Sequence, residues 1–142
     1  MRNQGWHLVS RPEGEPSAAN FRLVESEVPE LAEGQVLVRN RFLSLDPYMR
    51  GRMSDARSYA EPQPLDATMQ GGTVGTVVAS KHPKFAEGDA VVGMGGWQRY
   101  AVHDAGKPGV LRKVDVSRIP MSAYLGAVGM PGVTAWVGLV RI

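Results

Sequence analysis

Short apolar stretches alternate with segments rich in glycine, proline and polar residues along most of the chain. Residues 73–80 (TVGTVVAS) are rich in β-branched side chains and too short for an average helix, which predicts a strand. Comparable patterns predict strands in six further stretches: residues 6–9, 21–25, 36–45, 90–94, 97–102 and 111–114. The three strands between residues 73 and 102 are short and are joined partly by glycine turns. They predict a small, closed or nearly closed β-barrel in a mainly β fold.

The longest predicted strand, residues 36–45, is interrupted in the middle. Val36, Val38 and Phe42 fall on one face of this strand. The sequence RNR at residues 39–41 places three polar side chains in a row. Such a run is typical of an exposed or edge segment, and we expect this part of the strand to be one or the other.

A single helical turn is predicted directly after this strand, in the sequence DPYMRGRM. Asp46 can cap the N-terminus of a helix, and Pro47 suits the first helical position. Gly51 can end the turn.

Two further helices are predicted near the end of the chain. The first opens at residues 120–122, with Ser122 as its cap and Gly129 as its end. The second restarts at Met130. Apolar side chains recur along it at helical spacing and predict a buried stripe, made of Val133, Trp136, Val137 and Val140.

Composition narrows the class of protein. The net charge is only +2 and the basic residues are scattered, which argues against nucleic acid as a partner. There is no cysteine, so disulfides and zinc sites with thiolate ligands are excluded. No apolar run has the length of a signal-peptide core or a membrane span. We therefore expect a cytoplasmic protein that does not enter a membrane.

Catalytic motifs are not evident from the residues alone. The carboxylates show no spacing that singles out an acid/base pair. The histidines His7, His82 and His103 lie in separate segments, so each is expected to be a surface or strand residue rather than a metal ligand. Neither a Gly-x-Gly-x-x-Gly fingerprint after a strand nor a Walker loop occurs.

Four sequence blocks, taken together, carry a family resemblance. They are LSLDPYMRGRM at residues 43–53, GGTVG at 71–75, GWQRY at 96–100 and GMPGVTAWVGL at 129–139. In this order they resemble the zinc-independent branch of the medium-chain dehydrogenase/reductase superfamily that includes the prostaglandin reductases and plant double-bond reductases. The resemblance covers nearly the whole chain, and the DPYMR and MPGxTA blocks are its most specific parts.

The resemblance implies a fold and a domain organisation. Residues 1–120 would form a GroES-like, partly open β-barrel on the substrate side of an enzyme. Residues 121–142 would form a helical connection to a Rossmann domain that binds NADPH and is absent from this chain. It further implies a homodimer for the full-length protein.

The resemblance also implies which residues contact ligands. Tyr48 and Tyr59 match positions near the substrate, and Met130 and Thr134 match positions near the nicotinamide. No catalytic residue is expected in this part, because the tyrosine credited with handling the enolate would lie in the missing half. Tyr48 could instead anchor a tight turn, and Met130 and Thr134 could serve helix capping and packing.

Zinc is not expected. Zinc-dependent relatives carry Gly-His-Glu-x-x-Gly on the equivalent strand, where this chain has Gly71 at the histidine position and Gly72 at the glutamate position. Without zinc there is no strong Lewis acid to polarise an alcohol, which favours reduction of a C=C bond over alcohol oxidation.

The resulting hypothesis is the N-terminal domain of an NADPH-dependent oxidoreductase that reduces the C=C bond of α,β-unsaturated aldehydes or ketones. Two alternatives stay open. One is a quinone reductase of the same superfamily. The other is a non-enzymatic GroES-like binding module, since a fold does not fix a function.

Overall fold

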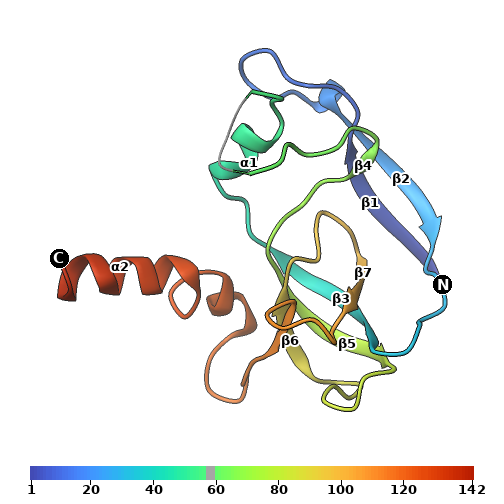
Figure 1. Cartoon of the computed structure of the whole chain (residues 1–142), viewed down its shortest axis with the longest axis vertical. Coiled ribbons are helices and arrows are strands. Elements are labelled where there is room, and N and C mark those ends of the chain that lie inside the picture. The colour runs from blue at the N-terminus through green and yellow to red at the C-terminus, as the bar shows by residue number, and fades with distance from the viewer. Residues whose placement is uncertain (57–59) are drawn as a thin grey trace.

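Two antiparallel β-sheets form the body of the protein, and one helix extends away from it (Figure 1). The computed structural model describes residues 1–56 and 60–142. One sheet has the order β2-β1-β4 and consists of β1 (Arg2–Leu8), β2 (Phe21–Glu27) and β4 (Ala67–Thr68). The helical segments are η1 (Ala18–Asn20), α1 (Tyr48–Arg52), η2 (Met121–Leu125) and α2 (Met130–Val140).

The larger sheet has five strands in the order β7-β3-β5-β6-β8 and curls into a half-barrel. Its strands are β3 (Gln35–Leu43), β5 (Thr73–Ser80), β6 (Ala90–Gly93), β7 (Tyr100–Asp104) and β8 (Leu111–Lys113). The predicted fold class, mainly β with short helices and a partly open barrel, is confirmed. The predicted bounds of β5 are confirmed as well.

Two apolar clusters hold the body together. Four valines on the inner face of the half-barrel are at most 2% exposed, and Phe85, Ala105 and Leu111 pack against them: Val36, Val38, Val77 and Val91. The second cluster joins α1 to the smaller sheet through Leu8, Met49, Met53 and Met69. Tyr48, the first residue of α1, packs against this second cluster, so its side chain is supported by buried residues.

Residues 39–41 were expected to be exposed or at a sheet edge: Arg39 and Arg41 are exposed, but the strand is not at an edge. β3 is paired on both sides, with β5 and with β7. A register shift between Asn40 and Phe42 breaks the alternation of the strand, so Phe42 is 48% exposed while Val36 and Val38 are buried. A run of polar residues is therefore accommodated by a bulge inside the sheet instead of by an edge.

Two predicted strand starts also differ from the structure. β7 begins at Tyr100, three residues later than predicted, because residues 97–99 bend across to the smaller sheet. There Trp6 donates its N–H to the carbonyl of Trp97 over 2.8 Å, and Arg99 donates its N–H to Gln4. β1 begins at Arg2, earlier than predicted, because its polar first residues pair with the end of β2.

The helix caps are not those predicted. α1 starts at Tyr48 with Pro47 as its N-cap; Asp46 contributes only its main-chain carbonyl, to Met49, and Gly51 lies inside the helix. The loop over α1 is fixed by Arg50, whose guanidinium donates hydrogen bonds to the carbonyls of Pro12 and Gly14.

Near the C-terminal end, η2 has Pro120 as its N-cap and includes Ser122, so the predicted serine cap is wrong. α2 does start at Met130, with Gly129 as its N-cap. The predicted buried stripe is wrong, because Val133 is 61% exposed and Trp136 is 55% exposed. Helical spacing identified an apolar face, but the described residues do not cover it. Nowhere in residues 1–56 and 60–142 is a helix both long and apolar enough to cross a bilayer.

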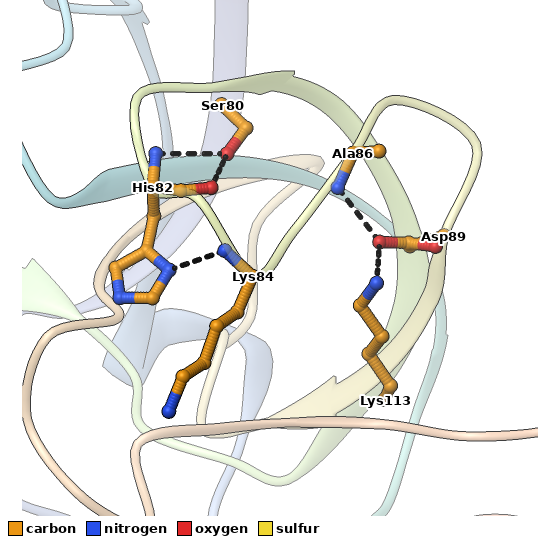
Figure 2. A network of polar contacts seen from close by, with 6 residues as sticks. All are labelled: Ser80, His82, Lys84, Ala86, Asp89 and Lys113. Atoms are coloured by element: carbon orange, nitrogen blue, oxygen red, sulfur yellow. Dashed lines mark hydrogen bonds and ion pairs between the residues drawn. The ribbon is translucent and has the colours of Figure 1, made fainter.

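The link between β5 and β6 is a tight polar loop (Figure 2). Ser80 accepts the N–H of His82, and the ring of His82 accepts the N–H of Lys84. The carboxylate of Asp89 accepts the N–H of Ala86 and pairs with Lys113 of β8 at 2.6 Å. The Ala86 hydrogen bond, with Lys113 beside it, holds the pKa of the Asp89 carboxyl below its usual range.

Candidate functional site

A cavity of about 350 Å³ lies on the outer face of the half-barrel, between β6, β8, α1 and the start of α2. Tyr48 of α1 and Met130 of α2 both line it. These two residues are 82 positions apart in the sequence, and the resemblance assigned one to the substrate and the other to the cofactor. The structure thus brings one predicted residue of each kind to a single cavity.

Tyr48 is positioned by packing on one side and by charge on the other. Its ring rests against the apolar cluster under α1. The guanidinium carbon of Arg52, one helical turn later, lies 5.9 Å from the ring centroid, a cation–π distance. The side chain is therefore held in a defined direction at the wall of the cavity.

Thr134 does not line the cavity. Its hydroxyl donates a hydrogen bond of 2.9 Å to the carbonyl of Met130, within the first turn of α2. This bond supports the helix whose first residue lines the cavity. The predicted cofactor contacts of Met130 and Thr134 stay predictions, and Tyr59 lies outside the described residues.

The loop after β6 is fixed by polar groups on neighbouring strands. Thr73 is 2% exposed, and its hydroxyl accepts the N–H of Gly95 at 3.0 Å. Asn40 donates to the carbonyl of Gln98, and the Gln98 amide donates to the carbonyl of Gly95, both at 2.9 Å. Met94, next to this anchored loop, lines the cavity.

Positions 71 and 72 have different surroundings. A Cβ atom at Gly71 would come within 2.9 Å of Leu43 Cδ1 and 3.0 Å of Met49 Cε, so these two side chains would have to shift to admit it. Gly72 borders the cavity, and a Cβ at this position would make only ordinary contacts. No group of three His, Asp or Glu residues suited to a metal occurs in the part of the chain that the structure describes. The absence of zinc from the protein stays a prediction.

The histidines are placed separately, as expected. His7 shares a hydrogen bond with Thr68, and His82 belongs to the loop of Figure 2. His103 is buried in the half-barrel at 5% exposure, and its Nε2 has no hydrogen-bond partner among the described residues. Burial lowers the pKa of His103 from its ordinary value of 6.5.

His103 should make folding stability depend on pH. Its imidazole takes up a proton at a lower pH in the folded chain than in the unfolded chain, where a histidine titrates at about pH 6.5. The stabilising contribution is therefore full above that pH and is lost below it. We expect the free energy of unfolding to fall as the pH drops below about 6.5 because of this residue.

Urea unfolding at several pH values measures this effect. His103→Gln should flatten that part of the profile, while the control His82→Gln, at a residue of the loop in Figure 2, should keep it. An unchanged slope in His103→Gln would show that the buried imidazole is not responsible.

Sequence reasoning missed several residues of the cavity. Asp46 and Arg112 supply its charged side chains. Tyr124 and Leu125 line it as well. Tyr124 is buried and its hydroxyl donates to the carbonyl of Asp115, so it forms a fixed wall. The alternation along β8 is the only sequence signal that could have placed Arg112 on the outer face.

Comparisons with known proteins show the family of the chain. Residues 4–111 match the family described as the N-terminal domain of oxidoreductase. NADPH-dependent curcumin reductase of Escherichia coli is 49% identical over 142 residues, which are 100% of this chain and 40% of that protein. The four sequence blocks are also similar to those of bacterial curcumin reductases, so the motifs and the whole-chain comparison agree.

More distant relatives and solved structures extend the comparison. Rat prostaglandin reductase 1 is 39% identical over 96% of this chain and 40% of its own length. The crystal structure of CurA from Vibrio vulnificus in complex with NADPH superposes with a TM-score of 0.88 at 48% identity, over 98% of this chain and 40% of that one. The chain therefore spans about two fifths of the length of these relatives.

Proposed function

Since the chain belongs to the family of N-terminal domains of oxidoreductases, we propose that it is the substrate-side part of an NADPH-dependent double-bond reductase. The substrates are α,β-unsaturated aldehydes or ketones, as in a curcumin reductase. The observation that carries the proposal is the shared cavity of Tyr48 and Met130. Relatives named as NADPH-dependent curcumin reductase and prostaglandin reductase support it.

The residues of the cavity fit a nicotinamide and a flat conjugated substrate. The N-terminal end of α2 contributes Met130 and Pro131, and Leu125 adds a further apolar surface. NADPH, when bound, supplies the hydride that the β-carbon of the enone accepts. Met130 would contact the nicotinamide end of the cofactor, with Thr134 supporting the turn, and most of the cofactor would be bound outside this chain.

Tyr48 can bind the carbonyl end of the enone substrate. Its hydroxyl can donate a hydrogen bond to the carbonyl oxygen, where negative charge develops as hydride arrives. Its ring offers a flat apolar surface to a conjugated substrate. Tyr59 is proposed as a second substrate contact on the strength of the family resemblance alone.

The wider organisation follows the same resemblance. Residues 1–120 act as the substrate-side domain, and residues 121–142 connect it to a nucleotide-binding domain. The proposed complete protein is a cytoplasmic homodimer that acts on a small molecule and binds neither nucleic acid nor zinc.

An NADPH oxidation assay tests the proposal. The complete protein should consume NADPH when an enone such as curcumin is present, whereas the isolated 142-residue chain should not, because it has no phosphate-binding loop. Consumption only with quinones would favour the quinone reductase. Absence of turnover with both substrate classes would favour a binding module.

A further inference from the structure

Arg112 is the one cationic side chain among the described residues that line the cavity. The other charged residue of the lining is Asp46, just before α1. Asp46 and Arg112 do not form an ion pair with each other, and Arg112 forms none with any other described carboxylate. A guanidinium at the wall of a largely apolar cavity is thus available to a ligand.

The register of the sheet explains why this side chain points to the cavity. Arg112 of β8 is directly opposite Val92 of β6, and such cross-strand pairs share a face. Met94 follows Val92 by two positions, and all three side chains line the cavity. The residue before Arg112, Leu111, packs into the core on the other face of the sheet.

The neighbouring basic residue, Lys113, differs from Arg112 because it has structural partners. Lys113 lies on the opposite face of β8, where its ammonium pairs with Asp89 at 2.6 Å (Figure 2). It also lies 5.8 Å from the ring centroid of Phe85. Arg50 and Arg11 are likewise engaged by main-chain carbonyls. Arg112 has no comparable partner among the described residues.

We propose that Arg112 selects substrates that carry an anionic substituent, such as a carboxylate, at the end remote from the reacting double bond. This inference rests on the proposed function and names a substrate class for the same cavity. A guanidinium matches a carboxylate with two parallel hydrogen bonds. Asp46, on the α1 side of the cavity, repels an anion, so the anionic end is directed to β8 and the enone to Tyr48.

A matched pair of substrates tests the inference: 4-carboxybenzalacetone and its methyl ester, which share one enone but differ in charge. With the complete protein and NADPH, Arg112→Met should lower kcat/KM for the acid by about tenfold, the loss of one charge-assisted contact. The loss for the ester should be smaller, so the acid-to-ester ratio of kcat/KM should fall. Arg112→Glu should lower kcat/KM for the acid further. The control Arg118→Met should leave kcat/KM unchanged for both substrates.

The outcomes separate the possible errors. Equal losses for acid and ester, with a raised KM for NADPH, would assign Arg112 to a cofactor phosphate and overturn the inference. Reduction of both substrates with an unchanged acid-to-ester ratio in Arg112→Met would also overturn it. If the wild type reduces neither substrate, the proposed function fails and the inference falls with it. Thermal melts of each variant, compared with the wild type, exclude a loss caused by misfolding.

Discussion

Replacing Gly75 by alanine is expected to lower the free energy of unfolding by about 3 kcal/mol or more, a large part of the total for a domain of this size. Gly75 lies on β5, opposite Asn40 of β3. A Cβ atom at this position would come within 2.2 Å of the main-chain carbonyl oxygen of Arg39. No rotamer change relieves a clash with backbone, so β3 and β5 would have to separate at the bulge.

Urea unfolding of Gly75→Ala beside Gly51→Ala measures the effect. Gly51 lies inside α1, and a Cβ there would meet no atom of the described residues within 4 Å. Its replacement by alanine should leave stability unchanged or raise it by roughly 0.5–1 kcal/mol, because alanine favours helix more than glycine does. Equal stability of Gly75→Ala and the wild type would show that β3 and β5 are not in close contact there.

Loss of the Tyr48 side chain is expected to have the largest effect on activity. Tyr48→Ala removes the hydroxyl and the ring surface from the cavity wall, so kcat/KM for an enone should fall by about a hundredfold, or roughly 2.7 kcal/mol. Tyr48→Phe keeps the packing against the cluster under α1. It should lose about tenfold, or roughly 1.4 kcal/mol, from the missing hydrogen bond.

Steady-state kinetics of the complete protein separates the two contributions. A donor that acts on developing charge changes kcat, whereas a contact made equally in ground and transition states changes mainly KM. Tyr100→Phe is the control, because Tyr100 lies on β7 and does not line the cavity. Wild-type kcat/KM in both Tyr48 variants, with normal melting, would make Tyr48 a turn residue only.

Local elements were predictable where sequence and packing agree. The β-branched run of β5 and the turn at Gly88, which has a positive φ of 89°, follow from residue type alone. Strand partners were not predictable from alternation, because a polar run such as residues 39–41 fits an edge or a bulge equally well. The apolar face of α2 was identified by its spacing, which does not say what covers it.

The candidate site was only partly predictable. Tyr48 and Met130 were found through family motifs, and the structure places them in one cavity. Arg112 belongs to none of the four sequence blocks, and Asp46, although part of the DPYMR block, was assigned only to a helix cap. The two residues line one cavity because β8 pairs with β6. Such a juxtaposition depends on sheet order, which a single sequence does not specify.

The position of a transferred deuterium tests the central claim most directly. The complete protein is incubated with an enone and NADPH that carries deuterium at the reactive C4 position, and the product is analysed by mass spectrometry and NMR. The account predicts a saturated ketone with deuterium on the former β-carbon and an intact carbonyl. Deuterium on the carbinol carbon of an allylic alcohol, the product of carbonyl reduction, would contradict it.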